Sequence, residues 1–491
     1  MFWKIFVIVA FFAVTIAISI FYKNKNKNAN EFVLAGRNVG PWLSAFAYGT
    51  TYFSATIFIG YSGQFGWKFG ASALWIGIGN ALIGSLLAWI IIGGRTRILT
   101  QHLNVATMPN FFAKRYNSKA LKLLAAVIIF IFLVPYTASV YKGLSGLFAI
   151  TFGIDFTYCI LGMAVLTAIF VVVGGYMGTA VNNFLQGAIM IGGIILIVTK
   201  VLGGQGGFTE AMNKLSQIPS TVNPSLNGAF TSIFGPEPLE LISVVILTSL
   251  GTWGLPQMIH KFYAIKNEKS VRLGTLISTI FALIIAGGSY FMGAFGKLYY
   301  NAEKIVFDDV IPTMMVQALP DVLIGIVLLV VLSASISTLA SLVLISSSTF
   351  ISDFIKSFNE KFMDNKKELL FIRIMCVVFI ALSVVIALIP TSLITNLMGL
   401  SWGALAGAFI GPFIYGLFWK GTTKISVYCS MIFAVGFVIL NFFMKFTSAS
   451  TAGAIAMISS LVIVPVVSLI TPKLKKEFVE EVFSGYKKKL D

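Results

Sequence analysis

Residues 47–63 read AYGTTYFSATIFIGYSG. The stretch is apolar enough to sit in a membrane helix, yet hydroxyl side chains crowd it and glycines interrupt it. Residues 248–257, TSLGTWGLPQ, repeat this combination further along the chain. Unwound backbone at membrane depth is tolerated only where it lines a cavity or is buried in protein, and its freed carbonyls are natural cation ligands. Both segments are therefore predicted to be interrupted helices beside a binding site, with close helix packing as the alternative reason for their glycines and hydroxyls.

The composition places the chain in a membrane. Its 491 residues are 57% hydrophobic and only 11% charged, whereas about a quarter of the residues in a soluble protein are charged. The net charge of +17 comes from short loops between apolar runs, without a basic helix or an aromatic stacking platform, which excludes nucleic acid as a partner. The three cysteines lie in apolar segments and imply no disulfide framework.

Thirteen apolar runs reach the length of about 20 residues that a bilayer-spanning helix needs. They centre near Val9, Thr51, Ile83, Phe130, Ala164, Ile191, Ile246, Ala282, Leu329, Val378, Ala406, Phe433 and Ile458. The first run lacks a signal-peptide cleavage site and is predicted to be retained. With the N-terminus outside, 27 of the 35 lysines and arginines fall in cytoplasmic loops or in the tail from Lys473. This positive-inside bias predicts a cytoplasmic C-terminus.

Ionisable residues at mid-membrane depth are the usual proton relays of proton-driven carriers. All eighteen acidic residues of this chain fall in predicted loops, tails or helix ends. His102 and His260 lie in or beside predicted cytoplasmic loops, where a solvated role is expected. The pattern disfavours proton coupling and leaves room for a sodium site built from neutral oxygens.

A third hydroxyl cluster lies within the apolar run 333–341, SASISTLAS. Ala334 and Ser337 share one helix face at this spacing. Serine and threonine also bond back to carbonyls of their own helix, so the cluster alone is a weak signal.

Five motifs in this order give the chain a resemblance to a known family. They are Phe32-Val33-Leu34-Ala35-Gly36-Arg37; Thr107-Met108-Pro109-Asn110-Phe111 with Lys114-Arg115-Tyr116; Gly174-Gly175; Gly254-Leu255-Pro256-Gln257 followed by Lys261-Phe262-Tyr263-Ala264; and Ser337-Thr338-Leu339. Over nearly its whole length the chain resembles the sodium:solute symporter family, which includes sodium/proline, sodium/pantothenate, sodium/sialic acid and sodium/glucose carriers.

The resemblance implies an all-α polytopic membrane protein with a leucine-transporter-type inverted five-helix repeat. Residues 1–491 would form one transporter domain of about 13 transmembrane helices. Its expected parts are an extra N-terminal helix (1–30), the two repeats (40–202 and 236–420), two trailing helices (421–472) and a basic cytoplasmic tail (473–491).

The resemblance also implies a sodium site between the broken first core helix and the eighth. Matched residue by residue, its ligands would be the carbonyls of Thr50, Phe53 and Ala334 and the hydroxyls of Ser337 and Thr338. Many family members carry an aspartate in an Asp-x-x-Gln pattern where this chain has Asn183-Phe184-Leu185-Gln186. Asn183 is thus only a possible secondary cation position, and one sodium ion per cycle is predicted.

The solute of such carriers binds beside the helix breaks, where this sequence offers a small and mostly uncharged lining. The matching residues are Tyr52, Ser54, Thr56, Ile57, Asn80, Thr248, Ser249, Thr252 and Trp253. Thr56-Ile57 stands where sugar carriers have an acidic and amide pair, which argues against a hexose. Tyr52 replaces an aspartate of the proline carriers.

Lys142 is the one charge placed within the membrane by the sequence, about 16 Å from the outer end of its helix at 1.5 Å per residue. A buried ammonium requires an anion or water. Since no acidic residue is expected at that depth, the solute's carboxylate is one candidate partner, and snorkelling towards a hydrated vestibule is the alternative.

The sequence therefore predicts a multi-pass carrier of the cell membrane that imports a small organic solute together with sodium. The solute is predicted to carry a carboxylate, as a monocarboxylate, a pantothenate-like acid, an amino acid or sialic acid does. A carrier of a neutral sugar or polyol and a transporter-fold sensor are the alternatives. An enzyme is disfavoured because no nucleophile–base pair or metal cluster is apparent, and no obligate protein partner is evident.

Overall fold

The structure is a computed structural model that describes residues 2–23, 29–220, 222, 224–300, 305–358, 365–389 and 393–487. Within these ranges the chain is almost entirely helical and forms no strand beyond a single β-bridge between Val39 and Ile265. The α-helices are α1 (Phe2–Lys23), α2 (Ala29–Leu34), α3 (Pro41–Tyr52), α4 (Ser62–Phe69), α5 (Leu74–Gly79), α6 (Gly94–His102), α7 (Met108–Tyr116), α8 (Lys119–Phe152), α9 (Phe156–Gly203), α10 (Phe208–Ser216), α11 (Pro238–Gly251), α12 (Pro256–Tyr263), α13 (Glu268–Gly293), α14 (Phe307–Ala318), α15 (Asp321–Thr349), α16 (Lys356–Phe358), α17 (Asn365–Ala387), α18 (Ile394–Phe418), α19 (Lys424–Met444), α20 (Ala449–Ile470) and α21 (Lys476–Lys487). Short 3-10 and π-helical segments link them: η1 (Ala35–Arg37), η2 (Thr56–Tyr61), η3 (Gly70–Ala73), η4 (Asn80–Leu87), η5 (Trp89–Gly93), η6 (Ala229–Thr231), η7 (Ala294–Leu298) and η8 (Phe350–Ile355).

Eleven helical stretches of the described chain are long and apolar enough to cross a membrane. Two of them, Phe156–Gly203 with 48 residues and Thr56–His102 with 47, exceed twice the length of about 20 residues that one crossing needs. Gly175 (φ 58°) bends the first and Gly70 (φ 63°) the second, at positive φ values that glycine adopts without a Cβ clash. Divided at these two glycines, the eleven stretches give thirteen segments, the number of crossings predicted, and the predicted runs near Ala164 and Ile191 are the two arms of α9.

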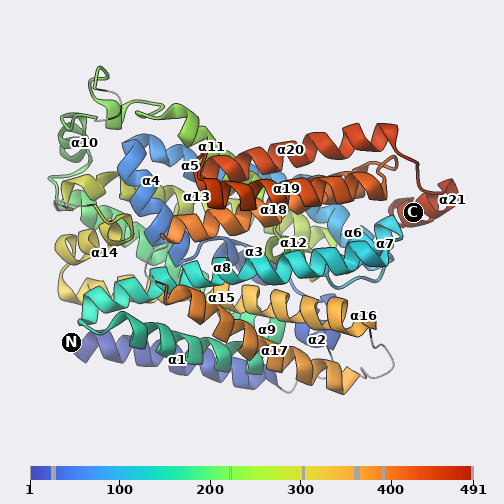
Figure 1. The fold of residues 1–491 in the computed structure, drawn as a ribbon. Helices are drawn as coiled ribbons and strands as arrows, with labels where there is room; N and C mark the ends of the chain where they lie inside the picture. The colour runs from blue at the N-terminus through green and yellow to red at the C-terminus, as the bar shows by residue number, and fades with distance from the viewer. Residues whose placement is uncertain are drawn as a thin grey trace.

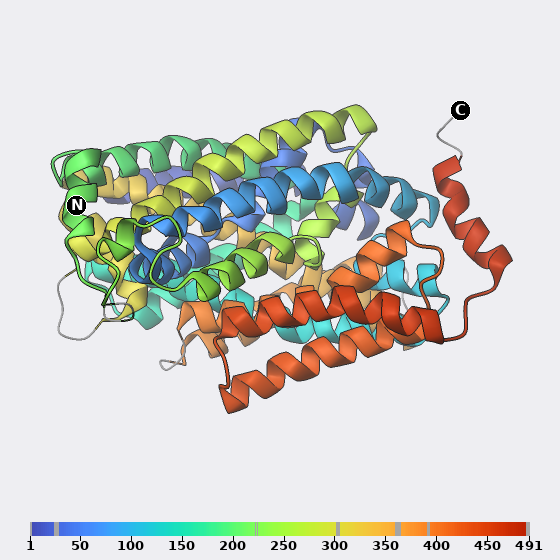
Figure 2. The same ribbon diagram turned by 90° about the horizontal axis from the view of Figure 1, so that it is seen from above.

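The long helices run side by side, with the N-terminus at one end of the bundle and α21 at the other (Figure 1). We call these the N-terminal end and the C-terminal end. Seen from above, α19 and α20 lie together along one side (Figure 2), where both pack against α18. The separation of the termini agrees with an odd number of crossings.

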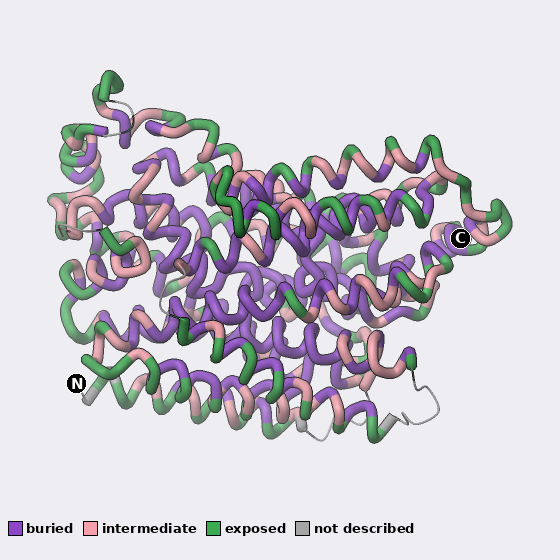
Figure 3. The backbone as a smooth tube through the Cα atoms, viewed as in Figure 1, coloured by how far each residue is buried: buried purple, intermediate pink, exposed green. Residues whose placement is uncertain are grey.

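Buried residues concentrate on the inner helices, whereas the outer helices alternate between buried and exposed positions (Figure 3). Nearly all of α15 from Val327 onward is buried. Large apolar side chains such as Phe443 and Ile470 are exposed on the outer helices. Such a surface suits lipid, which is as apolar as these side chains.

Two residues contradict the expectation of a solvated cytoplasmic loop. His260 and Lys261 each expose only 3% of their surface, because α12 extends to Tyr263 and packs against α3, α6 and α15. His102 is half-buried instead, and its Nε2 lies 3.0 Å from the Glu481 carbonyl of α21. Residues 24–28 and 359–364 of the predicted loops, and residues 488–491 of the predicted tail, lie outside the described residues.

Candidate functional site

Both predicted helix interruptions are present, and they face each other. α3 ends at Tyr52, and Phe53 adopts an extended backbone (φ −96°, ψ 97°) before the helix resumes at Thr56. The second helix ends at Gly251 and resumes at Pro256, where the proline occupies a first-turn position that needs no N–H donor. The Tyr52 hydroxyl donates to the Thr248 carbonyl at 2.6 Å, which joins the first break to the helix of the second.

The predicted sodium ligands lie where α15 crosses the end of α3. The Ser337 hydroxyl lies 3.0 Å from the Thr50 carbonyl and 3.0 Å from the Ala334 carbonyl. The Thr338 hydroxyl lies 3.2 Å from the Thr50 carbonyl and 3.0 Å from that of Ala334. Phe53 and Ala334 line one small void of about 10 Å³. The structure thus brings all five predicted residues together, and four of them are linked by hydrogen bonds.

These oxygens are suited to a hard monovalent cation. All four residues that are linked by hydrogen bonds are almost completely buried, and none carries a charge. The Ser337 hydroxyl has a further acceptor in the Ser333 carbonyl at 2.8 Å. It can therefore turn its proton to its own helix and present a lone pair to an ion without losing a hydrogen bond.

The predicted solute-binding side chains other than Lys142 also gather at the breaks, and all of them are buried. The Ser249 hydroxyl donates to Asn80 Oδ1 at 3.2 Å, and the Thr252 hydroxyl donates to the Gly84 carbonyl at 2.9 Å. The Trp253 indole donates to the Ile83 carbonyl at 3.0 Å. Two of these side chains, Ser54 and Ile57, line the small void of about 10 Å³. The central site is in a closed conformation.

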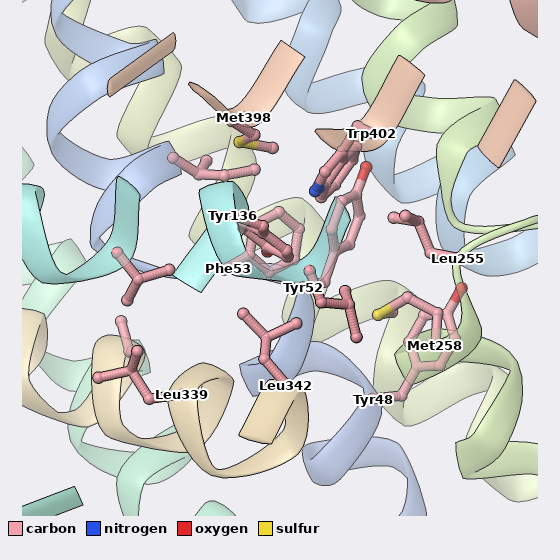
Figure 4. Close-up of a cluster of buried hydrophobic side chains, with 14 of the residues drawn as sticks. Tyr48, Tyr52, Phe53, Tyr136, Leu255, Met258, Leu339, Leu342, Met398 and Trp402 are labelled. Atoms are coloured by element: carbon pink, nitrogen blue, oxygen red, sulfur yellow. The ribbon is translucent and has the colours of Figure 1, made fainter. Parts of the chain in front are cut away.

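An aromatic cluster covers the first break and was not foreseen from the sequence (Figure 4). The Tyr52 ring stacks on Trp402 of α18 with centroids 5.9 Å apart, and Tyr136 of α8 meets Trp402 edge to face at 5.7 Å. The ring centroids of Phe53 and Tyr52 lie 4.3 Å apart. No sequence motif marks Tyr136 or Trp402, because each comes from a helix without a break.

Thr56 and Ser54 bind α8 and their own segment rather than α11. The hydroxyl oxygens of Thr56 and Ser139 lie 3.1 Å apart, and the Ser54 hydroxyl accepts from the Thr56 N–H at 3.2 Å. Ile57 lines the small void. Asn183 is buried in α9, and its Nδ2 has no hydrogen-bond partner among the described residues. No described contact joins Asn183 to the sodium ligands.

Lys142 lies outside the central site, in a cavity of about 370 Å³ nearer the N-terminal end. Its ammonium donates to the Ile389 carbonyl. Asp308 and Asp309 of α14 line the same cavity, and burial raises the pKa of Asp308 to about 6. The expectation that no acidic residue shares the depth of Lys142 is therefore wrong, because α14 folds inward and carries Asp308 to it.

Close contacts shut the site on both sides. Towards the N-terminal end, the Thr395 hydroxyl donates to Gln64, and Ile394 packs against Gly60. Towards the C-terminal end, the Arg37 guanidinium donates to backbone carbonyls after α6 and at the end of α12, including those of Val105 and Tyr263. These contacts tie the segments that flank both breaks to neighbouring helices.

Comparisons with known proteins agree with this architecture. Residues 32–434 match the sodium:solute symporter family. A sodium/proline symporter of Staphylococcus aureus is 27% identical over 442 residues, which cover 88% of this chain and 84% of the relative. Among solved structures, an Na⁺-coupled sialic acid symporter in a substrate-bound outward-open state superposes with a TM-score of 0.77 at 16% identity, covering 97% of this chain and 99% of its own. Mhp1, a nucleobase-cation-symport-1 family transporter, gives a TM-score of 0.54 at 14% identity, covering 92% and 97%.

The fold, the two facing helix breaks and a family match that covers most of the sequence lead to one assignment. The chain belongs to the sodium:solute symporter family.

Proposed function

We propose that this protein is a sodium-coupled symporter that imports a small carboxylate-bearing solute across the cell membrane, with one sodium ion per solute. Its N-terminal end would face outward and its C-terminal end the cytoplasm. Residues 40–202 and 236–420 would form the inverted repeats. The observation that carries the proposal is the buried cluster of uncharged oxygens between α3 and α15.

Sodium would act by joining two helices. The Ser337 and Thr338 hydroxyls lie within hydrogen-bond distance of the Thr50 carbonyl. An ion among these oxygens would replace those hydrogen bonds with stronger ion–dipole contacts and fix α3 against α15. The membrane potential adds about 2.3 kcal/mol per charge per 100 mV to the driving force.

The solute would occupy the space between the breaks once the outer contacts separate. Gln64–Thr395 and Ile394–Gly60 would part first to admit it. The contacts of Arg37 with carbonyls of the opposite end would part later to release it. Because the contacts at both ends are closed in this structure, its conformation resembles the occluded step of an alternating-access cycle.

A carboxylate-bearing solute is supported by two observations. The sodium/proline and sialic acid symporters that resemble this chain are named for solutes that carry a carboxylate. Lys142 lines the outer cavity together with Asp308 and Asp309, and its ammonium would pair with such a group on its way inward. The uncharged lining at Asn80, Ser249 and Thr252 favours a second candidate, a neutral solute such as a polyol.

Uptake into proteoliposomes distinguishes these candidates. Proline, pantothenate, sialic acid, lactate, glucose and a polyol would each be supplied in labelled form with and without an inward sodium gradient. One carboxylate is expected to accumulate, at least tenfold above the sodium-free level. Uptake restricted to glucose or the polyol would contradict the carboxylate assignment, and no uptake of any solute despite sodium binding would favour a sensor.

Replacing Lys142 by alanine is expected to raise the KM for the carboxylate solute about tenfold. This change corresponds to the free energy of about one charge-assisted hydrogen bond. The half-saturating sodium concentration should not change, because the residue lies outside the oxygen cluster. Lys68→Ala is the matched control, since Lys68 is paired with Glu240 at 2.9 Å. An unchanged KM in Lys142→Ala would remove this lysine from solute recognition.

A further inference from the structure

One buried cationic side chain lies close to the predicted sodium site, although it is not one of the predicted sodium ligands. Lys261 of α12 exposes only 3% of its surface. Its ammonium donates to the Ser341 hydroxyl at 2.9 Å and lies 5.1 Å from the centre of the Tyr176 ring. None of the ion pairs formed by described residues includes Lys261. A buried ammonium is costly, so its presence at membrane depth indicates a function.

Ser341 connects this ammonium to the sodium ligands. Its hydroxyl lies 2.9 Å from the Thr51 hydroxyl and donates to the Ser337 carbonyl at 3.0 Å. The Thr51 carbonyl in turn accepts from the Thr338 hydroxyl at 3.2 Å. Two hydrogen bonds therefore separate the ammonium from Ser337 along α15, and three separate it from Thr338 by way of Thr51 in α3.

The location of Lys261 also lets it link the segments beside the two helix breaks. α12 follows the second break and packs against α3 and α15. The Lys261 side chain thus connects α12, which follows the second break, to the Ser341 and Thr51 hydroxyls, which lie beside the first break. Its contact with the Ser341 hydroxyl supports the hydrogen bond between Ser341 and Thr51.

We propose that Lys261 is a positioning residue that weakens sodium binding: its ammonium holds the Ser341 hydroxyl beside Thr51 and repels an ion bound among the neighbouring oxygens. This inference rests on the proposed sodium coupling. Like charges separated by two hydrogen bonds, in a medium of intermediate dielectric, repel enough to change affinity by about tenfold. The repulsion accelerates release of sodium towards the C-terminal end, where α12 lies, and keeps the affinity low enough for rapid turnover.

Binding of ²²Na⁺ to the purified full-length protein tests this proposal. Lys261→Met and Lys261→Gln remove the charge, and the glutamine can still hydrogen-bond to Ser341. Both are expected to bind sodium about tenfold more tightly and to lower the maximal uptake rate. Lys261→Arg keeps the charge and should bind sodium as the wild type does.

Lys297→Met is the control for loss of a partly enclosed lysine. Lys297 lies over the Trp67 and Phe230 rings, 4.2 Å from each centroid, near the N-terminal end, and its replacement should leave sodium affinity unchanged. Wild-type affinity in the neutral Lys261 variants, or tighter binding in the arginine variant as well, would overturn the role of the charge. Absence of sodium binding by the wild type would instead contradict the proposed function.

Discussion

Replacing Ser337 and Thr338 together by alanine is expected to weaken sodium binding by more than a hundredfold and to abolish sodium-dependent uptake. Both hydroxyls contact the Thr50 carbonyl, so the double variant removes the two side-chain oxygens of the predicted site that link α15 to this carbonyl. A hydrogen bond to a charged group contributes about 1.5–3 kcal/mol, and two such contacts correspond to at least a hundredfold in affinity. Sodium titration of solute uptake and ²²Na⁺ binding both measure the effect.

Ser335→Ala is the matched control for this double variant. Ser335 is buried in the same helix, but its hydroxyl bonds only to Val331 of that helix among the described contacts. Its replacement should leave the half-saturating sodium concentration within about twofold of the wild type, since no ligand is lost. If the double variant also retained wild-type sodium affinity, the site would have to lie elsewhere.

A second large effect is expected at Gly293, where α13 meets α4. A Cβ on Gly293 would lie 2.1 Å from the Ser62 carbonyl oxygen, and one on Gly66 would lie 2.2 Å from the carbonyl carbon of Gly293. The obstructing atoms are backbone, so the two helices must move apart to accept any side chain. We expect Gly293→Ala to destabilise the protein by about 3 kcal/mol and Gly293→Val to prevent folding.

Thermal unfolding of the purified variants, followed by size-exclusion chromatography, measures this loss. Gly192→Ala in α9 is the control, because a Cβ there would meet no atom within 4 Å. The control should unfold at the wild-type temperature. Gly293→Ala unfolding at that same temperature would show that α4 and α13 pack less closely than the 2.1 Å and 2.2 Å distances require.

The two helix breaks were predictable because local chemistry marks them. Glycine, proline and hydroxyl side chains weaken a helix or rebind its free backbone groups, and they cluster at residues 47–63 and 248–257. The spacing of Ala334, Ser337 and Thr338 likewise places their oxygens on one face. These patterns require only near neighbours in sequence.

What remained unpredictable depends on contacts between distant segments. Lys261 lies in a basic, loop-like stretch, and its burial follows from how α12 packs after the break. Asp308 reaches the cavity of Lys142 from a short helix outside the long apolar runs. Tyr136 and Trp402 meet across two unbroken helices. The periodicity of the sequence does not predict such contacts between distant segments.

Sodium-gradient-driven uptake is the most direct test of the account. Proteoliposomes containing the wild-type protein would receive the solute identified in the panel, with a proton ionophore present and the membrane potential clamped. An inward sodium gradient should drive accumulation above equilibrium, and collapse of that gradient should release the solute. Accumulation that persists without sodium, or that follows a proton gradient instead, would contradict sodium-coupled transport by this protein.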